Sequence, residues 1–313
     1  MSEKIATRDA YGRVLAAIGE EYPDVVVLDA DLSKSTKTID FKKRFPERFF
    51  DFGVAEQNMI GTAAGLAAAG KIPFCSSFAV FATGRVFDQI RQSIAYTGLN
   101  VKICASHAGI TVGEDGSSHQ SIEDIALMRV LPNMTVFVPA DAVEVDRAVR
   151  AAVRIQGPVY IRLGRPAVPV LHKEDFVFRP GEAVQLRQGT DATIIATGIM
   201  VAAALEAAAE LANQGIEVRV LDMHTIKPLD GRAIVRAARE TGAIVTAEEH
   251  SVIGGLGSAV AEVVGESRPV PLKRVGIRDT FGESGKPAEL LDKYGLTPVH
   301  LVEAVKEVVL RKK

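Results

Sequence analysis

The sequence lacks an excess of charge of either sign. Its 313 residues include 37 Lys and Arg against 39 Asp and Glu, a formal net charge of −2. This balance gives no support for binding to nucleic acid or to an anionic membrane. No apolar run approaches the length of a membrane span, and residues 1–5 lack the basic and apolar regions of a signal peptide. We therefore expect a cytoplasmic protein that binds neither nucleic acid nor membrane.

Cysteine is also scarce. The two cysteines, Cys75 and Cys104, both lie in apolar, strand-like segments. Cysteines in such segments act as small apolar core residues, so neither a disulfide nor a metal pair is expected. The Cys and His residues do not show the spacing of a metal site, and no residue is assigned as a metal ligand.

The length and the apolar pattern predict two α/β domains. A chain of 313 residues exceeds what one core usually covers. Short apolar segments alternate with amphipathic helical patterns, which indicates a parallel sheet covered on both faces. In the first half of the chain these apolar segments are residues 25–28, 101–104, 135–138 and 159–161.

A proline-containing segment interrupts this alternation. Three prolines and mixed charge mark residues 166–189, and a second α/β pattern begins with an apolar strand at residues 192–196. Such a break is typical of a linker. We predict a first domain at residues 1–170, a linker at residues 171–190 and a second, smaller domain at residues 191–313.

The segment His107–Gln120 is the most informative part of the chain. It concentrates two imidazoles, two carboxylates and three glycines directly after an apolar strand at residues 101–105. In open α/β sheets, ligands bind at the carboxyl ends of the strands, and glycine lets the backbone turn tightly there. On spacing alone, an ordinary glycine-rich loop is an equally good interpretation.

The same segment resembles the substrate loop of transketolases, in the pattern His-x-x-Ile-x-Val-Gly-Glu-Asp-Gly-x-x-His-Gln. Residues 52–59 resemble the family segment that supplies the carboxylate activating thiamine diphosphate, and residues 76–81 resemble the segment whose aromatics hold its aminopyrimidine ring. The strings Leu131-Pro132-Asn133 and Pro139-Ala140-Asp141 follow in the family order. The resemblance implies an α/β fold with a thiamine-diphosphate pyrimidine-binding-type parallel-sheet domain, followed by a smaller transketolase C-terminal α/β domain.

One family motif is absent. Complete transketolases have an additional amino-terminal domain in which Gly-Asp-Gly and a later Asn hold Mg²⁺ and the cofactor's diphosphate. Gly-Asp-Gly does not occur in this sequence. The chain therefore resembles the C-terminal subunit of a split transketolase. The resemblance implies a partner N-terminal subunit that mainly binds the Mg²⁺, and a heterotetramer with self-association.

Glu56 matches the carboxylate that activates thiamine diphosphate. The imino tautomer of the cofactor needs a carboxylate on the opposite ring nitrogen, and a dry pocket favours proton sharing there. Without the resemblance, a solvated Glu at a helix amino terminus would be the simpler interpretation. Asp31, in the string Asp31-Leu32-Ser33, is counted with Glu56 among the cofactor-binding residues.

Phe78 and Phe81 match two aromatics that pack on the aminopyrimidine ring, a role that needs flat apolar area. Without the resemblance this pair would be assigned to the core. A third aromatic of the family cluster, often Tyr, falls at Gly84 here, so another residue is needed to complete the pocket. Arg85 is its nearest unusual neighbour and receives no role from the resemblance.

His107 and His119 match the two loop histidines that face sugar hydroxyls or the reacting carbon. Asp115 matches the carboxylate that contacts the C2 hydroxyl of the substrate. Histidine suits such tasks because its ordinary pKa lies near neutrality, so that it can donate, accept or relay protons. Together with Glu56, the two histidines are the predicted catalytic residues.

The resemblance also implies a binding site for a sugar phosphate. The matching positions are Arg8, Ser35, His107 and Arg165. The planar fork of arginine suits phosphate oxygens in both charge and geometry. Arg162 competes with Arg165 for this role, because both follow the last apolar segment of the first domain.

The predicted function is transfer of a two-carbon ketol unit from a ketose phosphate to an aldose acceptor. A deoxyxylulose-phosphate-synthase-like subunit is an alternative, since Val54-Ala55-Glu56-Gln57 resembles that family, although Ser106-His107 departs from it. A 2-oxo acid dehydrogenase beta-type subunit and a non-catalytic homologue are further alternatives. The sequence does not identify the donor and acceptor sugars.

Two other features receive structural interpretations. The helix that begins at Glu56 is rich in Gly and Ala, which indicates either a buried helix or, by the resemblance, a subunit interface. The string Glu248-Glu249-His250, followed by a glycine-rich turn, is a weak match to a dinucleotide motif. We expect the second domain to stabilise assembly instead of performing chemistry.

Overall fold

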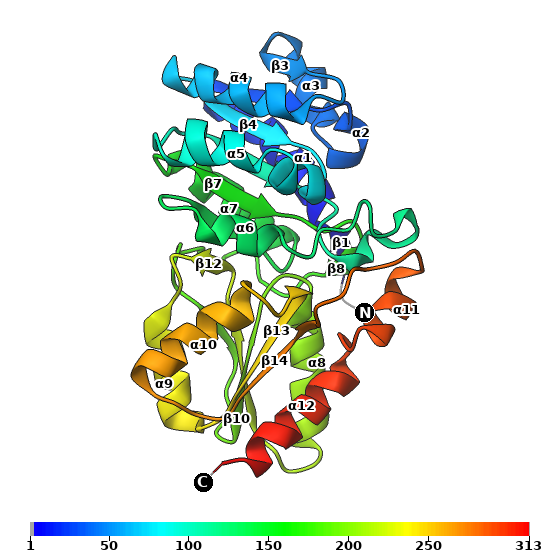
Figure 1. Cartoon of the computed structure of the whole chain (residues 1–313), viewed down its shortest axis with the longest axis vertical. Helices are drawn as coiled ribbons and strands as arrows, with labels where there is room; N and C mark the ends of the chain where they lie inside the picture. Colours follow the sequence, from blue (N-terminus) through cyan, green and yellow to red (C-terminus); the bar gives the residue numbers. More distant parts are fainter. Residues whose placement is uncertain (1–2, 313) are drawn as a thin grey trace.

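The computed structural model describes residues 3–312. Figure 1 shows two α/β units stacked along the long axis of the molecule, the first coloured mainly blue to green and the second yellow-green to red. The predicted fold, a parallel-sheet unit followed by a smaller α/β unit, is confirmed. No helix within residues 3–312 is long and apolar enough to cross a membrane.

The first unit is built on a seven-stranded sheet in the order β12-β6-β7-β5-β4-β2-β3. Its members are β2 (Val25–Asp29), β3 (Phe49–Asp51), β4 (Ile72–Ser76), β5 (Lys102–Ala105), β6 (Thr135–Phe137), β7 (Val159–Arg162) and β12 (Thr225–Lys227). All pairs among β2 to β7 are parallel. β12 comes from the second half of the chain and pairs antiparallel with β6, so both halves contribute to this sheet.

Helices cover both faces of this sheet. The α-helices are α1 (Thr7–Glu21), α2 (Ser33–Thr36), α3 (Ile39–Arg44), α4 (Glu56–Ala68), α5 (Phe87–Gln89), α6 (Asp124–Val130) and α7 (Ala142–Arg154). Shorter helical turns are η1 (Pro46–Arg48), η2 (Val80–Gly84), η3 (Ile90–Ala95) and η4 (Ile110–Asp115). Successive strand side chains point to opposite faces of the sheet. Val25 and Val27 of β2 therefore pack in a core with α1 and α7, whereas Val26 and Leu28 pack in a core with α4 and α6.

The second unit has a five-stranded sheet in the order β14-β13-β10-β11-β9. Its strands are β9 (Val184–Arg187), β10 (Ala192–Ala196), β11 (Val218–Asp222), β13 (Ile244–Ser251) and β14 (Leu272–Ile277). Its helices are α8 (Met200–Ala212), α9 (Gly231–Thr241), α10 (Leu256–Ser267), α11 (Pro287–Lys293) and α12 (Pro298–Leu310). Apolar residues of α9 and α10 join the same core as α4 and α6, so the two units share one packed interior.

The connection between the units is partly ordered into strands. β1 (Lys4–Ala6) pairs antiparallel with β8 (Ala167–Pro169), and β9 pairs antiparallel with β11 although it lies inside the expected linker. Cys75 and Cys104 are free and buried in the first unit, as predicted.

Candidate active site

The candidate site lies at the carboxyl ends of the parallel strands of the first sheet, where the connecting loops converge. The predicted residues follow five different strands or lie in the first turn of the first helix. The residues are Arg8 on α1, Ser35 after β2, Glu56 after β3, Phe78 and Phe81 after β4, His107, Asp115 and His119 after β5, and Arg165 after β7.

Glu56 is the first residue of α4, and its side chain is only 3% exposed. Arg85 Nη1 donates to both carboxylate oxygens at 3.0 Å. The guanidinium carbon of Arg85 lies 4.4 Å from the centre of the Phe81 ring, and its side chain is 46% exposed. The only ion-pair partner of this buried carboxylate within residues 3–312 is thus a long side chain that can move away.

Four rings form a continuous wall, which Arg85 links to Glu56 by lying over the Phe81 ring. The π-helical turn η2 is wider than an α-helical turn and carries Phe81. The ring centres of Phe78 and Phe81 are 6.1 Å apart, with planes 11° from parallel. Phe78 stacks on His107 at 3.8 Å, and the edge of His119 meets Phe81 at 5.5 Å. A Cβ atom on Gly84 would meet no other atom within 4 Å, so open space remains where the family often has Tyr.

His107 is held in one tautomer by its neighbours. Arg8 Nη1 lies 3.0 Å from His107 Nε2 and 3.2 Å from the backbone oxygen of Ser35. Because arginine can only donate, Nε2 must be the acceptor, and Nδ1 carries the proton that it donates to Ser106 Oγ at 2.9 Å. The backbone of His107 is left-handed, with φ of 56°, an uncommon conformation for a residue with a side chain.

Arg165 and the loop after β5 approach each other from two strands. Arg165 Nη1 donates to the backbone oxygen of Val112 and lies 3.7 Å from Asp115 Oδ2. His119 Nδ1 lies 2.9 Å from Ser118 Oγ. Both Arg165 and Asp115 are partly exposed, at 36% and 42% of their side-chain area, so a ligand can reach them.

The surroundings of His107 are positively charged. Burial lowers the pKa of His107 to about 3, and the charges of Arg8, Arg165, His119 and Lys37 act in the same direction. His107 is therefore neutral at physiological pH and accepts a hydrogen bond without adding charge. This arrangement suits the anionic group of a ligand between Arg8 and Arg165.

Comparison with known proteins assigns the family. Residues 3–170 match the family described as transketolase, pyrimidine binding domain, and residues 181–301 match the family described as transketolase, C-terminal domain. The chain belongs to the transketolase family. The predicted resemblance is confirmed over both units of this transketolase chain.

Individual relatives agree with this assignment. The chain is 52% identical over 306 residues to the 6-deoxy-6-sulfo-D-fructose transketolase subunit SqwH of Clostridium sp. strain MSTE9. The aligned residues cover 97% of this chain and 95% of the Clostridium protein. A solved structure described as split gene transketolase, inactive beta4 tetramer, is 60% identical with a TM-score of 0.93, over 99% of this chain and 100% of that one. Human transketolase is 39% identical over 315 residues, which are 99% of this chain and 50% of the human protein. The chain thus spans half the length of the human transketolase.

Arg162 and Asp31 make contacts with residues outside the predicted site. Arg162 is buried and pairs with Asp124, with Nε 2.8 Å from Oδ2, and it also donates to the backbone oxygen of Glu249. It is therefore committed to packing, whereas Arg165 is accessible. Asp31 is exposed beyond β2, where its backbone N–H donates to Asp51 Oδ1 at 3.1 Å.

Sequence reasoning missed the residues that hold the loop after β5. Glu249 of β13 accepts a hydrogen bond from the backbone of Thr111 at 2.7 Å, and a Cβ atom on Gly109 would collide with its carboxylate. Gln120 donates to the backbone oxygens of Ile110, Gly113 and Glu283. The available signal in the sequence was Gly109, which has a positive φ and packs against Glu249. Glu249 lies 140 positions away in sequence, so the sequence did not link the two residues.

The residues present fit the pyrimidine half of thiamine diphosphate. Arg85 connects a buried carboxylate, Glu56, to the flat apolar wall of Phe78 and Phe81, and Gly84 leaves space in the same turn. Aromatic rings bind in this way by stacking, with a polar partner at one edge. Gly-Asp-Gly, the family's diphosphate motif, does not occur in the sequence, so these residues account for the ring of the cofactor and not for its diphosphate.

Proposed function

We propose that this chain is the subunit of a thiamine-diphosphate-dependent transketolase that carries the pyrimidine half of the active site. The reaction is transfer of a two-carbon ketol unit from a ketose phosphate to an aldose acceptor, as in the pentose phosphate pathway. The observation that carries the proposal is the buried Glu56 carboxylate, which Arg85 links to the stacked rings of Phe78 and Phe81.

When bound, thiamine diphosphate supplies a nucleophilic carbon that adds to a ketone. Glu56 would hold a proton against the ring nitrogen of the aminopyrimidine, and Phe78 and Phe81 would orient that ring. In the structure both oxygens of Glu56 accept from Arg85. Glu56 can meet a ring nitrogen with a free lone pair, or give up one of these contacts because the Arg85 side chain is partly exposed and can move away.

The contacts of Arg8 support binding of an anionic substrate tail. Arg8 Nη1 donates to Ser35 and His107, whereas the buried Nε has no hydrogen-bond partner within residues 3–312. A buried N–H without a partner is costly and indicates a missing acceptor. An oxygen of a phosphate that also reaches Arg165 would satisfy it. We propose that His107, His119 and Asp115 contact the sugar itself. All three lie on the loop after β5, which Arg165 contacts.

A sulfonated sugar is a second candidate substrate. The 52% identical relative from Clostridium is named a 6-deoxy-6-sulfo-D-fructose transketolase subunit. A sulfonate has three acceptor oxygens, as a phosphate monoester does, but only one negative charge. Arg8 and Arg165 could bind either group, with the doubly charged phosphate gaining more from the two arginines.

We further propose that a partner chain completes the site in a cytoplasmic heterotetramer. It would hold Mg²⁺ and the diphosphate. The exposed side of α4, beginning next to Glu56, carries Gly61 and Gly65, and no atom lies within 4 Å of a Cβ at either position. Val54, two residues before Glu56, is 75% exposed. A flat helix face and an exposed apolar side chain beside a half-formed site are suited to a covering subunit.

Reconstitution tests the proposal. The chain and its candidate N-terminal subunit are purified together, and ketol transfer is measured from fructose 6-phosphate, 6-deoxy-6-sulfofructose and fructose. We expect transfer from the two anionic donors to exceed transfer from fructose. Calorimetry of the isolated chain with thiamine diphosphate and Mg²⁺ should show no tight binding. Tight binding by the isolated chain would refute the divided site, and a complex that transfers no ketol unit would refute the reaction.

A further inference from the structure

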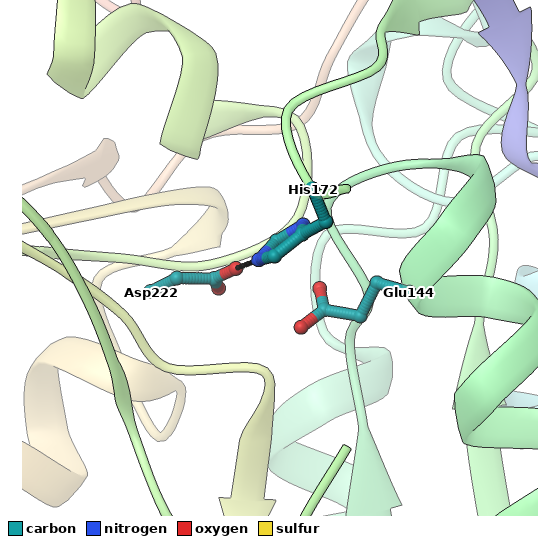
Figure 2. Close-up of side chains that lie close together, drawn as sticks. All are labelled: Glu144, His172 and Asp222. Atoms are coloured by element: carbon teal, nitrogen blue, oxygen red, sulfur yellow. Dashed lines mark ion pairs between the residues drawn. The ribbon is translucent and has the colours of Figure 1, made fainter. Parts of the chain in front are cut away.

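Three buried side chains converge at the junction of the two units, outside the candidate active site. Glu144 comes from α7, His172 from the segment after β8, and Asp222 from the carboxyl end of β11 (Figure 2). One ligand atom from each lies within 4.8 Å of the other two. The side chains of His172 and Asp222 are 3% and 0% exposed. The three elements are distant in sequence, so the cluster exists only in the folded chain.

Each of these side chains has an atom that points inward without a hydrogen-bond partner. Glu144 Oε2 accepts from the backbone of Ala140 at 2.7 Å, which leaves Oε1 free. Both carboxylate oxygens of Asp222 and Nε2 of His172 also have no hydrogen-bond partner within residues 3–312. Buried polar atoms without a hydrogen-bond partner are rare. Several of them in one place indicate that a cation could bind between them.

His172 is oriented as a metal-binding histidine would be. Its Nδ1 lies 3.2 Å from Asp141 Oδ2, and Asp141 also accepts from the backbone N–H of Leu171 and of His172. Nδ1 therefore donates to a fixed carboxylate, which turns Nε2 towards Asp222 Oδ2 at 3.4 Å. A carboxylate behind the second ring nitrogen is the usual outer partner of a ligating histidine.

Within residues 3–312, no Lys or Arg side chain balances the charge of this cluster, and the basic group next to Asp222 is the imidazole of His172, with Nε2 3.4 Å from Oδ2. No Lys or Arg nitrogen in the described part of the chain lies within 4.0 Å of Glu144 or Asp222 in an ion pair. Buried carboxylates without a cation are costly, and two of them match the charge of one divalent ion.

We propose that Glu144, His172 and Asp222 bind one divalent transition-metal ion, for which Zn²⁺ is the best match. Imidazole nitrogen and carboxylate oxygen are both zinc ligands, and with three of them from the protein a water would be the fourth ligand. The ion would join α7, the connection between the units and β11. Its role is to fix the two units against each other, because none of its ligands belongs to the candidate active site.

Metal analysis of the untagged full-length chain tests this site. The chain is unfolded in denaturant with a chelator and refolded with or without Zn²⁺, since buried ligands require loading during folding. We expect about one Zn²⁺ per refolded chain and a melting temperature roughly 5 °C higher than without metal. Co²⁺ should give the visible absorption of a bound ion. These measurements need neither thiamine diphosphate nor a partner chain, so they do not depend on the proposed function.

Variants identify the ligands. Asp222→Asn and Glu144→Gln keep the size of each side chain. Either should weaken Zn²⁺ binding by roughly tenfold to a hundredfold or more, because loss of an outer partner of a ligand alone has an effect of this size. His300→Gln removes a histidine of α12 that bonds to Thr297 and should leave binding unchanged. Two variants are used in case one does not fold. A wild-type chain that refolds without retaining Zn²⁺, Mn²⁺ or Co²⁺ overturns the proposal, and a proton shared by Glu144 and Asp222 then explains the cluster.

Discussion

Two buried glutamates show how the two units use carboxylates differently. Glu248, in β13, accepts from the backbone N–H groups of Leu256 and Gly257 at 2.7 Å each, at the start of α10. Glu56, at the start of α4, instead accepts from the side chain of Arg85. A carboxylate bound to backbone cannot change partner without unfolding a helix end. A carboxylate bound to an exposed side chain can exchange that partner for a ligand.

The same contrast separates two arginines three positions apart. Arg162 is 7% exposed and bound to Asp124, whereas Arg165 is 36% exposed and lies between loops. The junction of the units uses buried partners, and the candidate active site uses accessible ones. Burial and the type of partner thus distinguish residues that hold the fold from residues free to bind, although the residue types are identical.

The largest expected effect comes from replacing each of the two glutamates by glutamine. Glu56→Gln in the reconstituted complex should lower the ketol-transfer rate on the order of a hundredfold to ten-thousandfold, because a positioned acid-base group is lost. Glu248→Gln should leave the rate unchanged and lower the free energy of unfolding by about 1–2 kcal/mol, because hydrogen bonds to a charged acceptor weaken. Steady-state kinetics and denaturant unfolding measure both. Equal losses of rate in the two variants would contradict the comparison.

For the two arginines, we expect the buried one to affect stability and the accessible one to affect substrate binding. Arg162→Ala leaves Asp124 buried without its partner and should cost about 3–5 kcal/mol of the free energy of unfolding. Arg165→Ala should change stability by less than about 0.5 kcal/mol. It should raise the KM for anionic donors about ten- to a hundredfold relative to fructose, because a charge-assisted bond is lost. If Arg165→Ala affects all donors alike, the anionic tail is bound elsewhere.

The pH dependence of stability tests the neutral state of His107. An unfolded histidine binds a proton below about pH 6.5, and the folded His107 does so only below about pH 3. Between these values the unfolded state binds more protons, so the free energy of unfolding falls as the pH is lowered. The slope is at most about 1.4 kcal/mol per pH unit. His107→Asn should remove this slope from a series of unfolding curves, and His300→Gln should retain it.

Asp29 changes the free energy of unfolding with pH in the opposite direction, so its contribution must be separated from that of His107. Burial raises its pKa from 3.8 to about 6, so the folded state binds more protons between these values and is stabilised as the pH falls. This contribution is common to the wild type and to His107→Asn, and their difference cancels it. A difference that does not vary between pH 6.5 and pH 4 would show that His107 is protonated in the folded chain.

Much of the fold could be predicted because it follows from local patterns. The apolar segments expected at residues 25–28, 101–104, 135–138 and 159–161 are the strands β2, β5, β6 and β7. The edge strand β12 was not predicted, since its pairing with β6 joins segments about 90 positions apart. The sequence of β12 carries too little apolar pattern to be recognised as a strand, and its pairing depends on the packed structure.

The site could be predicted by residue type and order, but not by accessibility. The sequence pattern placed both His107 and His119 after one strand, and the structure brings their rings to the same aromatic wall. It did not separate Arg162 from Arg165, because both follow β7 and only burial distinguishes them. The part played by Glu249 was also hidden, since its partner Thr111 lies in the other unit.

The smallest expected effect concerns the exposed side of α4. Gly61→Ala introduces a methyl group into open space and should stabilise the isolated chain by about 0.5–1 kcal/mol, because alanine favours helices. Gly12→Ala is the matched control on α1, where a Cβ would lie 2.5 Å from Lys37 Cβ, and it should destabilise the chain. If a partner subunit packs closely on α4, Gly61→Ala should also weaken association, measured by sedimentation with the N-terminal subunit. A more stable chain with unchanged association would place the partner on another face, and Glu56 would then have to be covered from the side of Val54.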